Sequence, residues 1–196
     1  MALPRKHGEK MTIGNANRKP KLKGLTLIEL MIMMALLSIV LVLGIPSFQE
    51  LIRSNRLTAA NNALVGSLNL SRSEAIRRNV RVTVCKSANG AACTNGGSWE
   101  QGWIVFTDLN NNKTLESADE TVLLVHDGVG GKLTMVGDTD VSDYVSYVAR
   151  GNTQLTDGGI QSGTIKTCEG NVGSTGRSLN IAPTGRVQVV RKSVCS

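Results

Sequence analysis

The sequence of 196 residues is poor in aromatic and histidine side chains, with two residues each of Trp, Tyr, Phe and His. It contains no P-loop, no G-x-S-x-G and no H-E-x-x-H motif. His7 and His126 stand alone, without a Ser, Cys or second His in the arrangement of a catalytic triad or a metal site. No C-x-x-C pair is present either. We therefore expect a protein that is not an enzyme and that needs no cofactor.

Positive charge is concentrated at the N-terminus. The chain has 22 Lys and Arg against 15 Asp and Glu, a formal net charge of +7. Residues 1–24 hold seven of these cations and one acid, so they carry +6, and the remaining residues carry +1. The part of the chain after residue 24 is nearly neutral and has few aromatic residues, so it offers little for nucleic-acid binding. Because basic flanks stay cytoplasmic, we expect the C-terminal part to lie outside the cytoplasm.

An apolar run of 21 residues extends from Leu25 to Ile45 and contains a single charge, Glu29. A bilayer-spanning helix needs about 20 such residues. A secretory signal has a shorter apolar region, of about 7–15 residues, with its small-residue cleavage site behind it. Here the small residue, Gly24, precedes the run. A plain signal anchor explains the length of the run, but it explains neither Gly24 nor Glu29, whose carboxylate costs about 2.5–3.5 kcal/mol in a membrane.

The four cysteines form an even set in the part of the chain expected outside the membrane. They predict two disulfides in an oxidising compartment. Four cysteines allow three connectivities. Proximity in the sequence favours the pairs Cys85–Cys93 and Cys168–Cys195.

Hydrophobic periodicity predicts an α+β fold. A helix is expected from Leu25 to Arg78, bent or locally melted near Pro46, and its second half is amphipathic. From Asn79 onward the period changes to two, which indicates mostly antiparallel strands packed on the helix. The apolar positions of the amphipathic half are Leu57, Ala60, Leu64, Leu68 and Ala75. Strands are expected at 80–87, 102–108, 120–127, 132–137, 143–149, 163–168, 178–183 and 185–190.

The segment GLTLIEL, which begins at Gly24, resembles the N-terminal signal of type IV prepilins and pseudopilins. The resemblance implies cleavage between Gly24 and Leu25 by a prepilin peptidase, N-methylation of Leu25 and assembly into a filament. It also implies that Glu29 accepts the new N-terminal amine of a neighbouring subunit. The alternative for Glu29 is an acid that snorkels to the membrane interface. A helix with a proline at the place of Pro46 also resembles pilins.

The segment WIVFTDLNNNKTLESADETVL, residues 103–123, resembles a hairpin of the GspH/FimT family, and so does the C-terminal tail. This resemblance implies a cleaved leader (1–24), a membrane and assembly helix (25–45), its amphipathic continuation (46–79) and a periplasmic β-rich domain (80–196). The expected protein is a single-pass minor pilin or pseudopilin of the bacterial inner membrane, in a type IV pilus or a type II secretion system. The alternatives are a DNA-binding or adhesive pilus-tip subunit and a membrane-anchored sensor.

Two further sets of residues are weaker candidates for sites. Oxygen-bearing side chains alternate from Asp108, as in a calcium-binding loop, but Lys113 stands where such a loop needs glycine. An ordinary hairpin turn is the favoured alternative. In the DNA-binding alternative, the family's G-R-x-R motif is incomplete because Gln188 replaces the second Arg, and a solvated edge strand is favoured. The calcium candidates are Asp108, Asn110, Asn112, Thr114, Glu116 and Asp119, and the DNA candidates are Arg186, Arg191 and Lys192.

Overall fold

The computed structural model describes residues 24–116, 119–170 and 174–195. The predicted leader, apart from Gly24, lies outside the described residues. The chain divides into two compact units, residues 1–45 and 46–196. One α-helix, α1 (Leu27–Arg78), begins in the first unit and ends in the second. The predicted helix is therefore confirmed to within two residues at its start. Its backbone is helical through residue 46, so of the two alternatives predicted near Pro46 the local melting is wrong, and the bend stays a prediction.

In the first unit, α1 exposes large apolar side chains all around its surface. Their exposed fractions range from 49% at Leu41 to 78% at Leu27. A helix that is hydrophobic on all sides is normally buried by something else. Among the described residues, no helix meets the length and apolarity that a membrane crossing requires.

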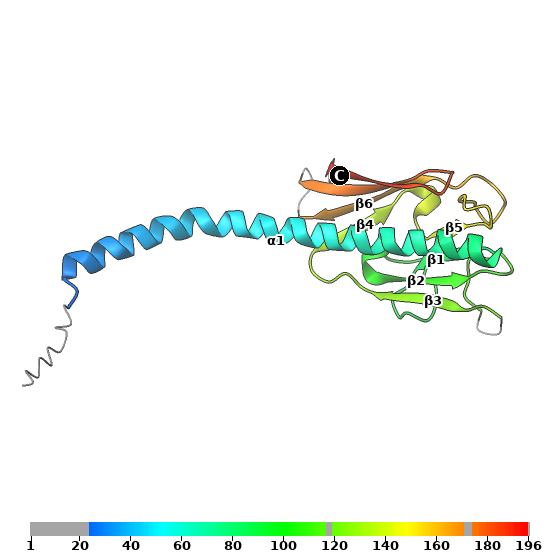
Figure 1. The fold of residues 1–196 in the computed structure, drawn as a ribbon, viewed down its shortest axis with the longest axis horizontal. Coiled ribbons are helices and arrows are strands. Elements are labelled where there is room, and N and C mark those ends of the chain that lie inside the picture. Colours follow the sequence, from blue (N-terminus) through cyan, green and yellow to red (C-terminus); the bar gives the residue numbers. More distant parts are fainter. Residues whose placement is uncertain (1–23, 117–118, 171–173, 196) are drawn as a thin grey trace, which may run out of the picture. The chain divides into compact units, whose positions relative to one another are not determined.

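The second unit contains two antiparallel sheets of four strands each. The predicted antiparallel strands are confirmed, with boundaries that differ by at most four residues, but their separation into two sheets was not predicted. The first sheet has the order β3-β2-β1-β5 and the second β4-β6-β7-β8. Figure 1 shows both sheets alongside the C-terminal half of α1. The strands are β1 (Val82–Lys86), β2 (Gly102–Thr107), β3 (Val122–Asp127), β4 (Leu133–Gly137), β5 (Tyr144–Tyr147), β6 (Gly163–Glu169), β7 (Thr175–Ile181) and β8 (Val187–Val194).

The main core lies between the amphipathic half of α1 and both sheets. All five apolar helix positions predicted from the periodicity are buried. Leu64 and Leu68 are fully covered and share one cluster with Val84 of the first sheet and Ile165 of the second. Burying a leucine side chain contributes about 1.5–3 kcal/mol relative to leaving it exposed. The single helix stripe therefore stabilises both sheets.

Polar contacts fix the position of α1 on the sheets. Trp103 of β2 is fully buried and donates its indole N–H to Ser67 Oγ at 2.8 Å. Thr167 of β6 donates to Asn61 Oδ1 at 3.3 Å. Buried polar groups of this kind are costly unless they are paired. One contact reaches each sheet, so together they define where the helix lies along both.

A smaller core covers the other face of the first sheet. It is built on Cys85, Ile104 and Phe106, and the loops that follow β1 and β2 pack on it through Cys93 and Leu115. The Cys85–Cys93 disulfide closes the first of these loops. Residues on β1 and β2 alternate between this small core and the main core, as the pleat of a strand requires.

Two tight turns at the end of the domain require glycine. Gly185 has a φ of +77°, and a Cβ atom built there would lie 2.1 Å from the carbonyl oxygen of Gly151. The same Cβ would lie 3.0 Å from the ring of Tyr147, which is buried and whose pKa is raised by that burial. Gly158 has a similar φ of +88° but open space around it. Gly158 and Gly185 therefore share a backbone conformation that favours glycine, but only Gly185 also lacks room for a side chain.

We expect Gly185→Ala to destabilise the protein more than Gly158→Ala. Both changes place a Cβ in the left-handed region, at about 1–2 kcal/mol, but only Gly185→Ala forces a backbone clash. Thermal unfolding followed by circular dichroism should show a fall in Tm of roughly 2–8 °C for Gly158→Ala and a clearly larger fall for Gly185→Ala. Equal shifts would contradict the close contact between Gly185 and the Gly151 carbonyl oxygen.

Candidate functional site

The first turn of α1 is closed by a capping box that the sequence analysis missed. Thr26 Oγ1 accepts a hydrogen bond from the backbone N–H of Glu29 at 3.3 Å, and the Glu29 carboxylate accepts one from the N–H of Thr26 at 3.4 Å. Thr-x-x-Glu is the sequence signature of this motif, so it was visible in GLTLIEL. Glu29 therefore has a local role in addition to the predicted one, because a carboxylate near a helix N-terminus is stabilising.

The geometry leaves the Glu29 carboxylate available to a second partner. Both capping distances exceed the 2.7–3.2 Å that is usual for N–H···O bonds, so each bond is weak. Glu29 and its neighbours are exposed, and within the described chain the Glu29 carboxylate accepts hydrogen bonds from Thr26 alone. A Cβ atom at Gly24 would meet nothing within 4 Å. Packing within the described chain therefore does not explain why residue 24 is glycine.

The loop from Asp108 to Glu120 folds back on itself through its own oxygens. The Asp108 side chain is fully buried and accepts hydrogen bonds from Thr83 Oγ1 at 2.8 Å and from the backbone N–H groups of Asn112 and Lys113 at 3.0 and 3.2 Å. Lys113, at the position where a calcium loop needs glycine, has a φ of +59°. The hydrogen bonds of Asp108 match those of a hairpin turn, the alternative that the sequence favoured.

The other oxygens of this loop are also used within it. Glu116 accepts from the side-chain amides of Asn110 and Asn112, and Glu120 accepts from the backbone N–H of Leu109. In the described part of the chain, no three His, Cys, Asp or Glu side chains gather in a way that could hold a metal ion. The calcium site was the less favoured interpretation of this loop, and it stays untested.

The residues proposed for DNA contact do not form one surface. Arg186 lies in the turn before β8, whereas Arg191 lies on β8 directly opposite Arg177. Gln188 and Val190 alternate with Arg191, so they point to the other face of the strand. For Lys192, the structure describes the backbone alone.

The cysteine and histidine predictions can be compared directly with the structure. The disulfides are Cys85–Cys93 and Cys168–Cys195, the pairing that proximity favoured.

His126 stacks on the ring of Trp103 with their centroids 4.0 Å apart and their planes 7° from parallel. His126 thus packs on the edge of the main core.

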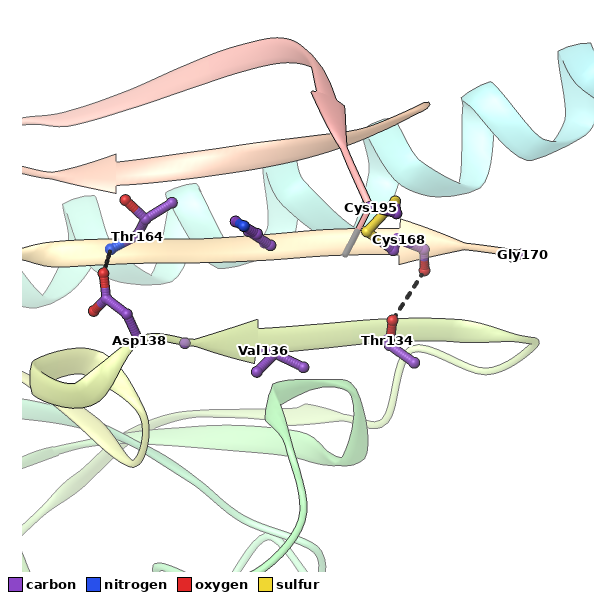
Figure 2. Close-up of a pocket in the computed structure, with 9 residues that line it drawn as sticks. Thr134, Val136, Asp138, Thr164, Cys168, Gly170 and Cys195 are labelled. Carbon is purple, nitrogen blue, oxygen red and sulfur yellow. Dashed lines mark hydrogen bonds between the residues drawn. A yellow bond between two sulfur atoms is a disulfide. The ribbon is translucent and has the colours of Figure 1, made fainter. Parts of the chain in front are cut away.

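A groove of about 520 Å³ runs along the outward faces of β4 and β6 (Figure 2). Its polar groups serve the sheet. Asp138 accepts from the backbone N–H of Thr164 at 2.7 Å, and Thr134 lies 3.5 Å from the carbonyl oxygen of Cys168. Val136 and the Cys168–Cys195 disulfide supply apolar surface. The described residues that line the groove include no nucleophile paired with a base.

Two protein-family models match separate segments of the chain. The family model for the prokaryotic N-terminal methylation motif matches residues 19–45. The model described as type II transport protein GspH matches residues 60–185, which is more than half of the chain. The chain belongs to the GspH family. Together with the methylation motif, this shows a minor pilin or pseudopilin subunit, so the predicted family is confirmed. GspH proteins are structural pilins, which assemble with other pilins.

The pilin fold is also confirmed by solved structures. Two crystal forms of the type IV minor pilin FimU of Pseudomonas aeruginosa are similar to this structure. The first has 22% sequence identity and a TM-score of 0.55, and the match covers 74% of this chain and 98% of FimU. The second has 21% identity and a TM-score of 0.52, and covers 71% and 99%. No curated protein sequence matches the chain.

We expect the melting temperature to be insensitive to calcium and sensitive to Asp108. Asp108→Asn replaces one acceptor oxygen by an NH₂ group that faces donors, which should cost about 1–3 kcal/mol. The matched control is Asp119→Asn, in the same exposed loop, which should change the melting temperature little. Scans with calcium and with a chelator should coincide for all three proteins. A calcium-dependent rise that Asp108→Asn abolishes would instead identify a calcium site.

Proposed function

We propose that this chain is a processed, membrane-anchored subunit that enters a filament through the N-terminal half of α1. A prepilin peptidase would cut between Gly24 and Leu25, and Leu25 would be N-methylated. The apolar run 25–45 would anchor the subunit in the bacterial inner membrane, with the second unit in the periplasm. The observation that supports this most directly is the methylation motif over residues 19–45, which coincides with an exposed, apolar helix.

The energetic argument for assembly rests on the uncovered surface of α1. Apolar area removed from water contributes about 25 cal/mol per Å². Large apolar residues from Leu25 to Ile45 are about half exposed or more in the isolated chain. Membrane insertion would cover them before assembly, and neighbouring helices would cover them in a filament. Both environments disfavour an unpaired carboxylate. An arrangement of neighbouring helices that gives Glu29 a positively charged partner would therefore be favoured over one that does not.

Cleavage would create the partner that Glu29 needs. The new α-amine of Leu25 carries a positive charge at neutral pH and lies about one helical turn from the carboxylate of its own chain. A neighbour shifted along the axis could present its amine to this carboxylate instead. Opposite charges attract strongly where water is excluded. The weak capping bonds from Thr26 would be exchanged for this ion pair.

The filament would be either a type IV pilus or the pseudopilus of type II secretion. The similarity of the fold to that of FimU, a type IV minor pilin, supports the pilus. Deletion of the coding sequence, scored for twitching motility and for exoprotein secretion, would separate the two machines. The DNA-binding alternative is not favoured, because Arg186 and Arg191 lie apart and the chain after the leader carries a charge of only +1.

Processing can be tested by mass spectrometry of the membrane-extracted protein. We expect the mature N-terminus at Leu25 with one added methyl group, and we expect Gly24→Lys to leave the leader in place, because the peptidase needs a small residue at the cut. A matched control is Gly66→Ala, at a helical glycine with open space around it. An intact N-terminus in a host that carries the peptidase would refute processing.

The role of Glu29 can be tested by Glu29→Val in the full-length protein. We expect normal membrane insertion but at least about ten-fold less recovery with other pilins, because loss of one partner leaves the other charge buried and unpaired. The control is Glu50→Val, which removes an exposed acid of the same helix that lies 3.6 Å from Arg53. Unchanged recovery of the Glu29→Val protein would rule out the proposed ion pair.

A further inference from the structure

Four strands form the outer edges of the two sheets, and the described chain covers two of these edges. At the β4 edge, the backbone N–H of Met135 donates to Glu100 Oε2 at 2.7 Å. At the β5 edge, Tyr147 forms an isolated bridge with Thr153. Among the described residues, no such partner from another segment covers β3 or β8, and β8 is the longer of the two, with eight residues. Figure 1 shows β8 in red at the edge of the second sheet.

The free edge of β8 presents the backbone groups of alternate residues. In the turn before β8, the N–H of Ala182 donates to the carbonyl oxygen of Arg186 at 2.9 Å, so these two residues form a hydrogen-bonded pair. Hydrogen-bonded and non-hydrogen-bonded pairs alternate along an antiparallel ladder. The backbone groups of Gln188 therefore face β7, whereas those of Val187 and Val189 face away from the sheet. No described residue outside the sheet forms a backbone hydrogen bond with either valine.

Two arginines, which we call the arginine pair, lie next to this edge. Arg177 of β7 is directly opposite Arg191 of β8, and such an arrangement puts the two Cβ atoms about 4.5–5.5 Å apart. Leu179 and Val189, two residues away on the same strands, pack in the main core. Because side chains alternate along a strand, the arginine pair lies on the same face of the sheet as these core residues. Arg177 is half-buried and Arg191 is exposed.

The described chain does not offset the charge of the arginine pair. Like charges directly opposite each other on a sheet are destabilising. Neither arginine forms an ion pair with a described acid. Elsewhere in the second unit such charges are offset, because hydrogen bonds from Arg77 and Arg78 lower the pKa of the Glu74 carboxyl to about 2. The free edge of β8 thus combines open backbone groups with an uncompensated double positive charge.

We propose that β8 accepts an extended segment of a different pilin as a fifth strand of the second sheet, and that an acidic side chain of this segment lies against the arginine pair. The backbone groups of Val187 and Val189 supply the hydrogen bonds, as in strand addition to an exposed sheet edge. The carboxylate offsets the two like charges and sets the register of the added strand. A second copy of β8 contains no acid, so charge favours a different subunit. The inference rests on the proposed function, since a minor pilin assembles with other pilins.

Photocrosslinking of the full-length chain in host membranes tests where the partner lies. With Gln188→p-benzoylphenylalanine, at an exposed position of β8, irradiation should link the chain to a different pilin through a peptide that contains Asp or Glu. The matched control is Val136→p-benzoylphenylalanine, which is 53% exposed on β4, where the edge is covered. Its yield with the same peptide should be lower by at least about five-fold. Equal yields would place the partner on the face of the sheet and overturn strand addition.

Removal of one edge N–H group tests the backbone hydrogen bonds. Val189→Pro removes an N–H that faces the free edge, and proline is tolerated on edge strands in this orientation. The matched control is Val189→Ala, which truncates the same partly buried side chain but keeps the N–H. The yield of the Gln188 adduct should fall about five-fold with Val189→Pro and change little with Val189→Ala. Protease resistance in the membranes shows that both variants are folded, and equal yields from two folded variants would contradict strand addition.

Reversal of one charge tests the acidic character of the partner and leaves the core unchanged. Arg191→Glu places a carboxylate opposite Arg177, so the domain should stay folded while the Gln188 adduct falls about five-fold. Arg191→Lys should keep most of the adduct, and so should the control Arg186→Glu, in the exposed turn before β8. The yield should also fall as salt is added, because exposed charges are screened over about 10 Å at 0.1 M. A yield that responds neither to Arg191→Glu nor to salt would overturn the proposal, whatever the outcome with proline.

A second probe separates failure of this inference from failure of the proposed function. Leu37→p-benzoylphenylalanine, 55% exposed in the apolar half of α1, should link to other pilins when the chain enters a filament. If it does, strand addition is refuted when the Gln188 probe yields no adduct, or an adduct only with a second copy, with lipid or with nucleic acid. The proposed function then stands. If neither probe links to a pilin, the proposed function fails and the inference fails with it.

Discussion

The packing of one helix stripe against two separate sheets is the constraint on which the second unit depends. Among the residues that the structure describes, the two sheets share no strand and form no ladder with each other. Their common neighbour is α1, whose residues Leu64 and Leu68 contact the cores of both. Trp103 and Thr167 anchor the helix by one hydrogen bond from each sheet. Loss of this stripe would leave each sheet with an uncovered apolar face, which is why the helix is the centre of the domain and not an appendage to it.

The same helix has two different surfaces along its length, and the difference separates folding from assembly. In the second unit the apolar stripe from Leu57 to Ala75 is covered by the sheets, whereas Phe48 and Leu51, at the start of that unit, remain exposed. In the first unit large apolar side chains point in all directions, and the described chain covers none of them well. A helix of the second kind is stable only when a membrane or neighbouring helices enclose it. The capping box of Thr26 and Glu29 marks where this segment begins, and it holds the carboxylate by bonds weak enough to exchange.

The distal end of the second unit is built from loops of both flanks of β1. Loops that are far apart in the sequence meet there because β1 is flanked by β2 and β5. The turns of Gly151 and Gly185 contact each other there, and Glu116 in the loop after β2 accepts hydrogen bonds from two asparagine amides. Exposed charges of this kind contribute little to folding stability.

Local features were determined by the sequence alone. The helix and its buried stripe, the existence of the strands, the two disulfides and the N-terminal motif all followed from patterns within short stretches, because period and proximity act locally. The capping box was equally local and was overlooked. The division of the strands into two sheets, the stacking of His126 on Trp103 and the meeting of Arg72 with the Gly151 and Gly185 turns could be decided only by the tertiary structure. Each depends on which distant strands pair, and no short stretch of sequence encodes that choice.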